Sequence, residues 1–159
     1  MSVAYLQTPL GTALMEGDAD GIQKVSITNN PFPPEFVSVP DDLTVGVQQL
    51  NDYFAGRRTV FDLKLNPQGT DFQKKVWEAL LEVPFGRTLS YLDLSRRLGD
   101  EKAIRAVAAA NGKNPIWLIV PCHRIIGSDG SLTGYAGGLW RKKWLIEFEK
   151  GGLQGNLFS

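Results

Sequence analysis

The sequence contains a single cysteine and a single histidine among 159 residues, and the two are adjacent, at Cys122 and His123. One cysteine excludes an intrachain disulfide, and one Cys with one His excludes a structural zinc site built from such ligands. No apolar run reaches membrane-spanning length, and the N-terminus lacks the basic and then apolar pattern of a signal peptide. We therefore expect a protein of the reducing cytoplasm, with no membrane contact, no metal and no cofactor.

The chain also lacks a net charge at neutral pH, and a net charge of zero by itself argues against a nucleic-acid partner. The charges are unevenly distributed, however. Residues 1–86 contain 6 Lys or Arg and 11 Asp or Glu, whereas residues 87–159 contain 11 and 6, so the two parts carry −5 and +5. This asymmetry indicates that the second part meets an anionic partner, although a chance division of surface charge explains the counts equally well.

The first part of the chain has the alternating pattern of β-strands separated by turn-forming residues. Strands are expected at Val3–Leu6, Thr12–Glu16 and Ile22–Ile27. A helix is expected at Leu43–Ala55, because apolar residues recur there at helical spacing, and a further strand at Val60–Leu65. The turn-forming residues 66–69 then mark a domain boundary, which predicts an α/β domain over residues 1–67 and a second domain over 68–150.

The second domain has a mainly helical pattern. Thr70 and Gln73 form a potential capping box at the start of its first helix. Two short helices follow at Ser90–Leu98 and Glu101–Asn111, and their tight Gly-containing turn makes them a helix-turn-helix candidate. A last helix is expected at Leu139–Lys150, and residues 151–159 are expected to form a loose C-terminal tail.

The second of the two short helices is rich in alanine. Its small side chains fit either tight packing in a core or close approach to another surface, and both interpretations stay open. Lys102 and Arg105 share one side of this helix, at i and i+3, where they are either solvated charges or contacts to an anion.

The segment around the cysteine carries the strongest chemical signal. The apolar run Ile116–Val120 predicts a buried strand, and Pro121 ends it. A thiol and an imidazole just beyond the end of a buried strand suit the wall of a reactive pocket. The alternative is that Cys122 is a small buried hydrophobic residue and His123 an ordinary core or surface group.

The residues 121–127, PCHRIIG, are similar to the active-site motif of the O6-alkylguanine-DNA alkyltransferases, or methylated-DNA–protein-cysteine methyltransferases. The resemblance covers roughly residues 9–150, with further matches in the same order and spacing. These matches are 49–58 (QLNDYFAGRR), 69–73 (GTDFQ), 76–77 (VW), 86–91 (GRTLSY), 105–107 (RAV), 114–115 (NP) and 134–139 (GYAGGL). The motif alone is moderately specific, whereas the set together is strongly specific.

The resemblance implies a fold and an activity. The fold is an N-terminal α/β domain like a ribonuclease-H roll, followed by a mainly helical, winged-helix-like domain with a helix-turn-helix. The activity is direct repair by a monomer of double-stranded DNA that contains O6-alkylguanine. A methyl or small alkyl group moves from O6 of a flipped-out guanine, or from O4 of thymine, to the protein's own cysteine, once per molecule.

The resemblance also assigns roles to single residues. Cys122 is the nucleophile and alkyl acceptor, His123 the water-mediated base and Glu149 the residue that orients it. Tyr91 contacts the base and the phosphate, and Asn114 tethers the active-site strand. The implied DNA contacts are Arg105, Thr70, Gln73, Tyr91, Lys102, Ala106, Ala109 and Arg124. The implied lining of the substrate pocket is Tyr135, Ala136 and Trp117.

Two of these positions depart from the family pattern. Trp117 stands where many members have a smaller residue, which predicts a narrower range of alkyl groups. Ala136 replaces a serine of some members, which predicts the loss of one contact to the leaving base.

Two other functions are alternatives to alkyl transfer: a DNA-binding damage sensor without transfer, and a Cys-His thiol hydrolase. The joint presence of Cys122, His123 and Glu149 argues against the sensor, and the adjacency of the Cys-His pair against the hydrolase.

Overall fold

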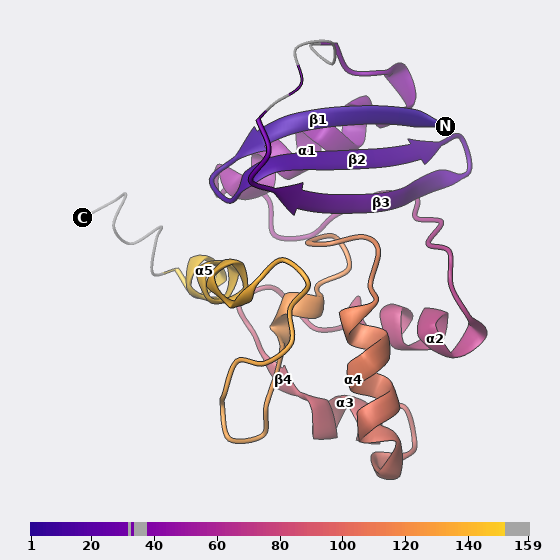
Figure 1. Ribbon diagram of the computed structural model, residues 1–159, viewed down its shortest axis with the longest axis vertical. Helices are drawn as coiled ribbons and strands as arrows, with labels where there is room; N and C mark the ends of the chain where they lie inside the picture. Colours follow the sequence, from indigo (N-terminus) through magenta and orange to yellow (C-terminus); the bar gives the residue numbers. More distant parts are fainter. Residues whose placement is uncertain (32, 34–37, 152–159) are drawn as a thin grey trace. The chain divides into compact units, whose positions relative to one another are not determined.

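The computed structural model describes residues 1–31, 33 and 38–151, and the chain divides into two compact units, drawn in sequence colours in Figure 1. The first unit comprises Met1–Gln68 and Pro115–Trp117, and the second Gly69–Asn114 and the chain from Leu118 onward. The predicted division at residue 67 lies next to this one, except that residues 115–117 join the first unit. The predicted tail falls, apart from Gly151, outside the described residues.

The first unit is built on a three-stranded antiparallel sheet. Its strands are β1 (Ser2–Thr8), β2 (Gly11–Asp18) and β3 (Gly21–Thr28), in the order β1-β2-β3. The register pairs buried residues with buried residues, as in Ala4 opposite Met15 and Met15 opposite Val25. Alternation of apolar and polar residues therefore gives the sheet one buried face, and the three predicted strands are confirmed.

A single α-helix covers the buried face of the sheet. The helix α1 (Thr44–Phe54) follows the 3-10 turn η2 (Asp41–Leu43) and packs behind the strands in Figure 1. It buries apolar side chains at helical spacing, including Val47, Leu50 and Tyr53, as the sequence predicts. The helix predicted at Leu43–Ala55 is confirmed.

The strand predicted at Val60–Leu65 is wrong. Only Leu65 pairs with the sheet, through an isolated parallel bridge to Ile22. The backbone of Asp62 instead bonds to the buried side chain of Gln49, whose Oε1 accepts from the Asp62 N–H (3.0 Å) and whose Nε2 donates to its C=O (3.2 Å). A side-chain amide thus replaces the ladder that the alternating pattern implied.

The second unit is mainly helical. Its first helix, α2 (Asp71–Leu80), begins at the predicted capping box, with both the Thr70 and the Gln73 hydrogen bonds present. A two-stranded parallel sheet joins β4 (Leu89–Ser90) to β5 (Ile125–Ile126). The remaining helical elements are α3 (Tyr91–Arg97), η3 (Glu101–Ala103), α4 (Ile104–Gly112), η4 (Cys122–Arg124) and α5 (Leu139–Glu149). None of the helices in the described ranges is long and apolar enough to span a bilayer.

The alanine-rich helix α4 uses small side chains on both sides. Val107 and Ala110 are buried against the unit, and Trp77 of α2 donates its indole N–H to the Ala110 carbonyl at 2.8 Å. The opposite side, with Arg105 and Ala106, is exposed. The helix therefore packs tightly against the unit on one side and is exposed to solvent on the other.

The buried run before the cysteine is not the predicted strand. Ile116 forms one parallel bridge with Val25, and the Trp117 N–H donates to the Val25 carbonyl at 3.0 Å. The chain then turns at Leu118, whose φ of 73° lies in the left-handed region that leucine rarely adopts. Because the backbone reverses there, the ladder cannot continue, although Val120 stays buried.

Replacing Trp77 by Phe tests the packing of α4. The change removes the indole donor and leaves the Ala110 carbonyl with only the Lys113 N–H (3.1 Å) as partner, so we expect the free energy of unfolding to fall by about 0.5–1.5 kcal/mol. Urea denaturation followed by circular dichroism measures it. The matched control is Trp140→Phe, because Trp140 is 52% exposed. Equal stability of the two variants would contradict the role given to this hydrogen bond.

Candidate active site

A buried carboxylate links two other side chains of the second unit. Glu149, the last residue of α5, accepts from His123 Nε2 on its Oε2 at 2.8 Å. The same carboxylate accepts from Arg124, whose Nε lies 2.7 Å from Oε1 and whose second terminal nitrogen lies 3.0 Å from Oε2. His123 is 0%, Arg124 6% and Glu149 6% exposed, so the whole cluster is shielded from water. The arrangement brings together the predicted base and its predicted orienting residue.

Local backbone structure places these groups. Pro121 starts the short helix η4, and the Arg124 N–H donates to the Pro121 carbonyl at 3.0 Å. Two buried asparagines hold the segment from the α4 side: Asn114 Nδ2 donates to the Val120 carbonyl at 2.8 Å, and Asn111 Nδ2 to the Cys122 carbonyl at 3.4 Å. The side chain of Asn114 therefore ties the active-site segment to the end of α4.

The surroundings of His123 keep its imidazole neutral. Burial lowers the pKa of His123, and the nearby charges of Arg124 and Lys142 lower it further, against the opposing effect of Glu149. Burial alone would raise the pKa of Glu149, but His123 and Arg124 outweigh it and hold that pKa well below its usual range. With Glu149 anionic, the imidazole donates from Nε2, which leaves Nδ1 as an acceptor. Nδ1 is buried and has no hydrogen-bond partner among the described residues.

Cys122 is a buried thiol whose proton needs an acceptor. Its residue is 5% exposed, and burial raises the pKa of the thiol to about 11, although Asn114 and Lys142 lower it in part. The thiol is therefore protonated at neutral pH, and a nucleophilic sulfur requires that the proton be removed. The neutral His123 is the adjacent residue with a free acceptor atom.

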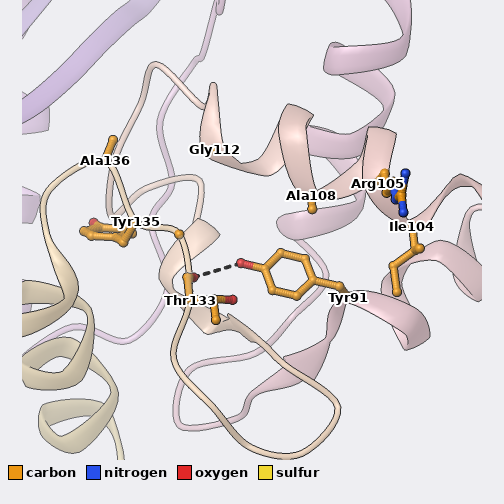
Figure 2. A pocket seen from close by; sticks show the side chains of 9 residues that line it. Tyr91, Ile104, Arg105, Ala108, Gly112, Thr133, Tyr135 and Ala136 are labelled. Carbon is orange, nitrogen blue, oxygen red and sulfur yellow. Dashed lines mark hydrogen bonds between the residues drawn. The ribbon is translucent and has the colours of Figure 1, made fainter.

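A pocket of about 550 Å³ opens between α3, α4 and the loop before α5. Its lining is Tyr91, Ile104, Arg105, Ala108, Gly112, Thr133, Gly134, Tyr135 and Ala136. Figure 2 shows the Tyr91 ring extending from α3 toward the loop, where its hydroxyl donates to the Thr133 carbonyl at 3.1 Å. Burial raises the pKa of both Tyr91 and Tyr135, and the ionised form of Cys122 would raise each further, so the sulfur lies within electrostatic range of both tyrosines.

A buried lysine completes the site. Lys142, on α5, is 0% exposed, and its Nζ donates to the same Thr133 carbonyl at 2.8 Å. Its ammonium also lies 5.7 Å from the centre of the Tyr91 ring. Burial lowers the pKa of Lys142 to about 8, while Cys122 raises it, so the side chain is a cation at neutral pH close to the thiol. It links α5 to the loop that lines the pocket.

Comparison with known proteins identifies the family. The family model described as "6-O-methylguanine DNA methyltransferase, DNA binding domain" matches residues 71–151. A methylated-DNA–protein-cysteine methyltransferase of Methanosarcina acetivorans is 43% identical over 153 residues, which is 94% of this chain and 98% of the relative. The chain belongs to the methylated-DNA–protein-cysteine methyltransferase family.

Solved structures agree with this assignment. The crystal structure of the Mycobacterium tuberculosis O6-methylguanine methyltransferase is 42% identical and gives a TM-score of 0.84, with 94% of this chain and 93% of the other covered. A crystal structure of the Mycobacterium tuberculosis protein OGT in complex with DNA gives a TM-score of 0.86 at 42% identity, with 95% and 94% covered. The mixed α/β fold of this methyltransferase-family chain is thus shared along nearly its whole length.

The residues predicted to contact DNA lie on separate elements. Four of them, Lys102, Arg105, Ala106 and Ala109, share the exposed face of η3 and α4. Thr70 and Gln73 cap α2, where each side chain is bonded to the other's backbone N–H. A DNA role for these two residues stays a prediction.

Two predicted roles do not fit the geometry. Arg124 is unsuited to contact DNA, because its side chain is 7% exposed and its nitrogens bond to Glu149 and to the Val83 carbonyl. A buried guanidinium in this network is unable to reach a phosphate without leaving it. Trp117 belongs to the first unit and is not among the residues that line the pocket, whereas Tyr135 and Ala136 are.

Two residues of the site, Lys142 and Asn111, were not predicted from the sequence. Lys142 precedes Glu149 by two helical turns and Leu145 by three residues, which places all three on one side of α5. That spacing was the available signal for a buried lysine. Asn111 gave no signal, because its contact to the Cys122 carbonyl depends on tertiary structure. Across the ranges that the structure describes, no cluster of three or more His, Cys, Asp or Glu could hold a metal ion.

Replacing Lys142 by Met tests the electrostatics of the thiol. At pH 7, where Lys142 is charged, loss of the buried ammonium should lower the fraction of Cys122 thiolate and slow alkylation of Cys122 by iodoacetamide about tenfold. The alkylation rate at pH 7 measures this change without interference from other thiols, because Cys122 is the only cysteine. The matched control is Lys143→Met, since the Lys143 side chain is 68% exposed. An unchanged alkylation rate at pH 7 in Lys142→Met would contradict the proximity of the two groups.

Proposed function

We propose that this protein repairs alkylated DNA directly by moving a methyl or small alkyl group from O6 of guanine to Sγ of Cys122. The observation that carries the proposal is a buried thiol next in sequence to a neutral imidazole that a buried carboxylate holds, within electrostatic range of two tyrosines that line a pocket of about 550 Å³. Nucleophile, base and orienting group are the recurrent parts of covalent catalysis by a side chain.

The transfer balances without a cofactor. His123 Nδ1 takes the thiol proton, directly or through one water molecule, and the sulfur attacks the O6-alkyl carbon. A carbon–sulfur bond forms, the carbon–O6 bond breaks, and its electron pair stays on the purine. The purine then takes up one proton and regains its N1–H, O6-carbonyl form. The product is a thioether, which has no leaving group comparable to the purine, so each protein molecule reacts once.

The substrate must reach the pocket from duplex DNA. The O6-alkyl carbon of a stacked guanine is inaccessible to a side chain at the base of a pocket, so the nucleotide rotates out of the helix. The exposed face of α4, with Arg105 and the small residues Ala106 and Ala109, suits insertion into the minor groove. Arg105 also lines the pocket, which supports a role in filling the space left by the extruded base.

The finer fold assignment supports the same function. The short helices α3 and α4, separated by Gly99 with φ of 88° and by η3, form the proposed helix-turn-helix of a winged-helix-like domain. The three-stranded sheet and α1 correspond to the proposed ribonuclease-H-like roll. We assign DNA binding to the second unit of a monomeric protein. In this assignment Lys102 and Arg105 face phosphates, and Thr70 and Gln73 lie at the edge of the contact. Activity on O4-alkylthymine belongs to the same proposal.

Methyl transfer to Cys122 has a direct test. Incubation with a duplex oligonucleotide that carries O6-methylguanine should add one methyl group per protein molecule, located on Cys122 by mass spectrometry of peptides. Cys122→Ala should retain DNA affinity and gain no methyl group. Tight binding by unmodified wild-type protein would instead identify a damage sensor, and turnover of an ester substrate would identify a hydrolase.

The role of Arg105 in base extrusion has a separate test. Arg105→Ala should slow repair of duplex DNA by about tenfold or more but leave reaction with the free base O6-methylguanine almost unchanged, because only the duplex must be opened. The matched control is Arg97→Ala, an exposed arginine at the end of α3. Equal losses on both substrates would show that Arg105 acts on the chemistry or on the pocket and not on the duplex.

A further inference from the structure

Arg124 holds the site together without facing the pocket. Its Nε and one terminal nitrogen bond to the two oxygens of Glu149, at 2.7 and 3.0 Å, and the other terminal nitrogen donates to the Val83 carbonyl at 2.7 Å. The planar guanidinium thus occupies a fixed orientation, with the Phe85 ring centre 5.8 Å from its carbon. A two-point contact of this kind sets both the position and the rotation of the carboxylate.

His123 and Arg124 compete for one negative charge. His123 Nε2 and one terminal nitrogen of Arg124 both donate to Glu149 Oε2, at 2.8 and 3.0 Å. A carboxylate whose charge is already matched by a guanidinium has less attraction left for a second cation. The imidazole therefore stays neutral and offers a lone pair on Nδ1, the buried atom with no partner among the described residues.

We propose that Arg124 is a positioning residue for alkyl transfer: its charge and its two-point contact with Glu149 keep His123 neutral and hold Nδ1 as the proton acceptor for Cys122. The inference rests on the proposed function for its kinetic consequence. Its effect on the imidazole, however, is a property of the folded protein alone. The residue touches neither the substrate nor the reacting sulfur and acts through Glu149.

The charges that surround His123 decide the direction of the effect. Glu149 of α5 favours the imidazolium, whereas Arg124 of η4 and Lys142 of α5 oppose it. The neighbouring ionisable groups Cys122, Tyr91 and Tyr135 are neutral at pH 7, because burial raises the pKa of each. Without Arg124, Glu149 would be a buried anion with His123 as its hydrogen-bonded partner. The imidazole would then bind a proton on Nδ1 and lose its capacity to accept one from Cys122.

The turn after α2 supports the same arrangement. Val83 supplies the carbonyl that fixes the far side of the guanidinium, and Gly86, with φ of 81°, lies so close to α5 that a Cβ there would be 3.2 Å from the Glu149 carbonyl oxygen. The turn at residues 83–86 thus packs against the C-terminal end of α5. Arg124 joins this turn to the Glu149 carboxylate through polar contacts on both sides.

The experiment uses the fact that His123 is the only histidine in the chain. Full-length protein labelled with ¹⁵N-histidine gives one pair of imidazole nitrogen signals, which report tautomer and pKa. In the wild type we expect the neutral Nε2–H tautomer at pH 7. Arg124→Met should raise the pKa of His123 by about 1–3 units, so that the imidazolium is populated at pH 7. The midpoint of the single-turnover transfer rate against pH should rise by the same amount.

Two further variants separate charge from structure. Arg124→Lys keeps the positive charge and should keep the His123 pKa within about half a unit of the wild type, although its single ammonium is unable to make the two-point contact. The matched control is Arg57→Met, which breaks an exposed ion pair with Asp52 in the first unit and should change neither readout. Arg124→Gln, a neutral residue with a donor, replaces Arg124→Met if circular dichroism shows the latter to be unfolded.

Each outcome has a definite meaning. A raised His123 pKa in the neutral variants and a retained one in Arg124→Lys support the proposal. A folded neutral variant with an unchanged His123 pKa and tautomer overturns it, even if transfer is slow, because Arg124 would then be merely structural. If the wild type transfers no methyl group, the proposed function fails, but the nitrogen signals still decide whether Arg124 controls the imidazole.

Discussion

The site depends on one buried carboxylate at an unfavourable place. Glu149 is the last residue of α5, where the helix dipole opposes a negative charge, and it is only 6% exposed. It stays ionised because Arg124 and His123 both donate hydrogen bonds to it, and these contacts hold its pKa well below the usual range. A buried anion of this kind is stable only with its partners in place. The orientation of the imidazole follows from that constraint, and the chemistry proposed for Cys122 depends on it.

Residues from several elements hold the segments around Glu149 and Cys122 in place. The two asparagines at the end of α4 hold the backbone of the Cys122 segment, and Lys142 ties α5 to the loop that lines the pocket. Tyr91 bonds to the same loop carbonyl as Lys142, at Thr133. The exposed face of α4, the pocket and the thiol are therefore held in place by the same elements of the second unit. Base extrusion and alkyl transfer by one protein would require such an arrangement.

Local patterns predicted the elements that depend on local interactions. The alternation in the first three strands, the spacing in α1 and the capping box at Thr70 each reappear in the structure, because pleat, helical face and cap are set by near neighbours. The failures arose where a distant side chain competes for the backbone, as Gln49 does for Asp62, or where the chain reverses, as at Leu118. The pairing of Arg124 with Glu149, 25 residues apart, escaped prediction for the same reason, since only the tertiary fold brings them together.

The central claim is that the Glu149 carboxylate keeps His123 ready to take the proton of Cys122. The most direct measurement is the single-turnover rate of methyl transfer from a duplex oligonucleotide to wild-type protein and to Glu149→Gln, with DNA affinity measured on the same samples. The substitution keeps the shape of the side chain and removes its charge. The account predicts a rate at least about a hundredfold lower with unchanged affinity, in the range typical of lost acid–base catalysis. Equal transfer rates would contradict it.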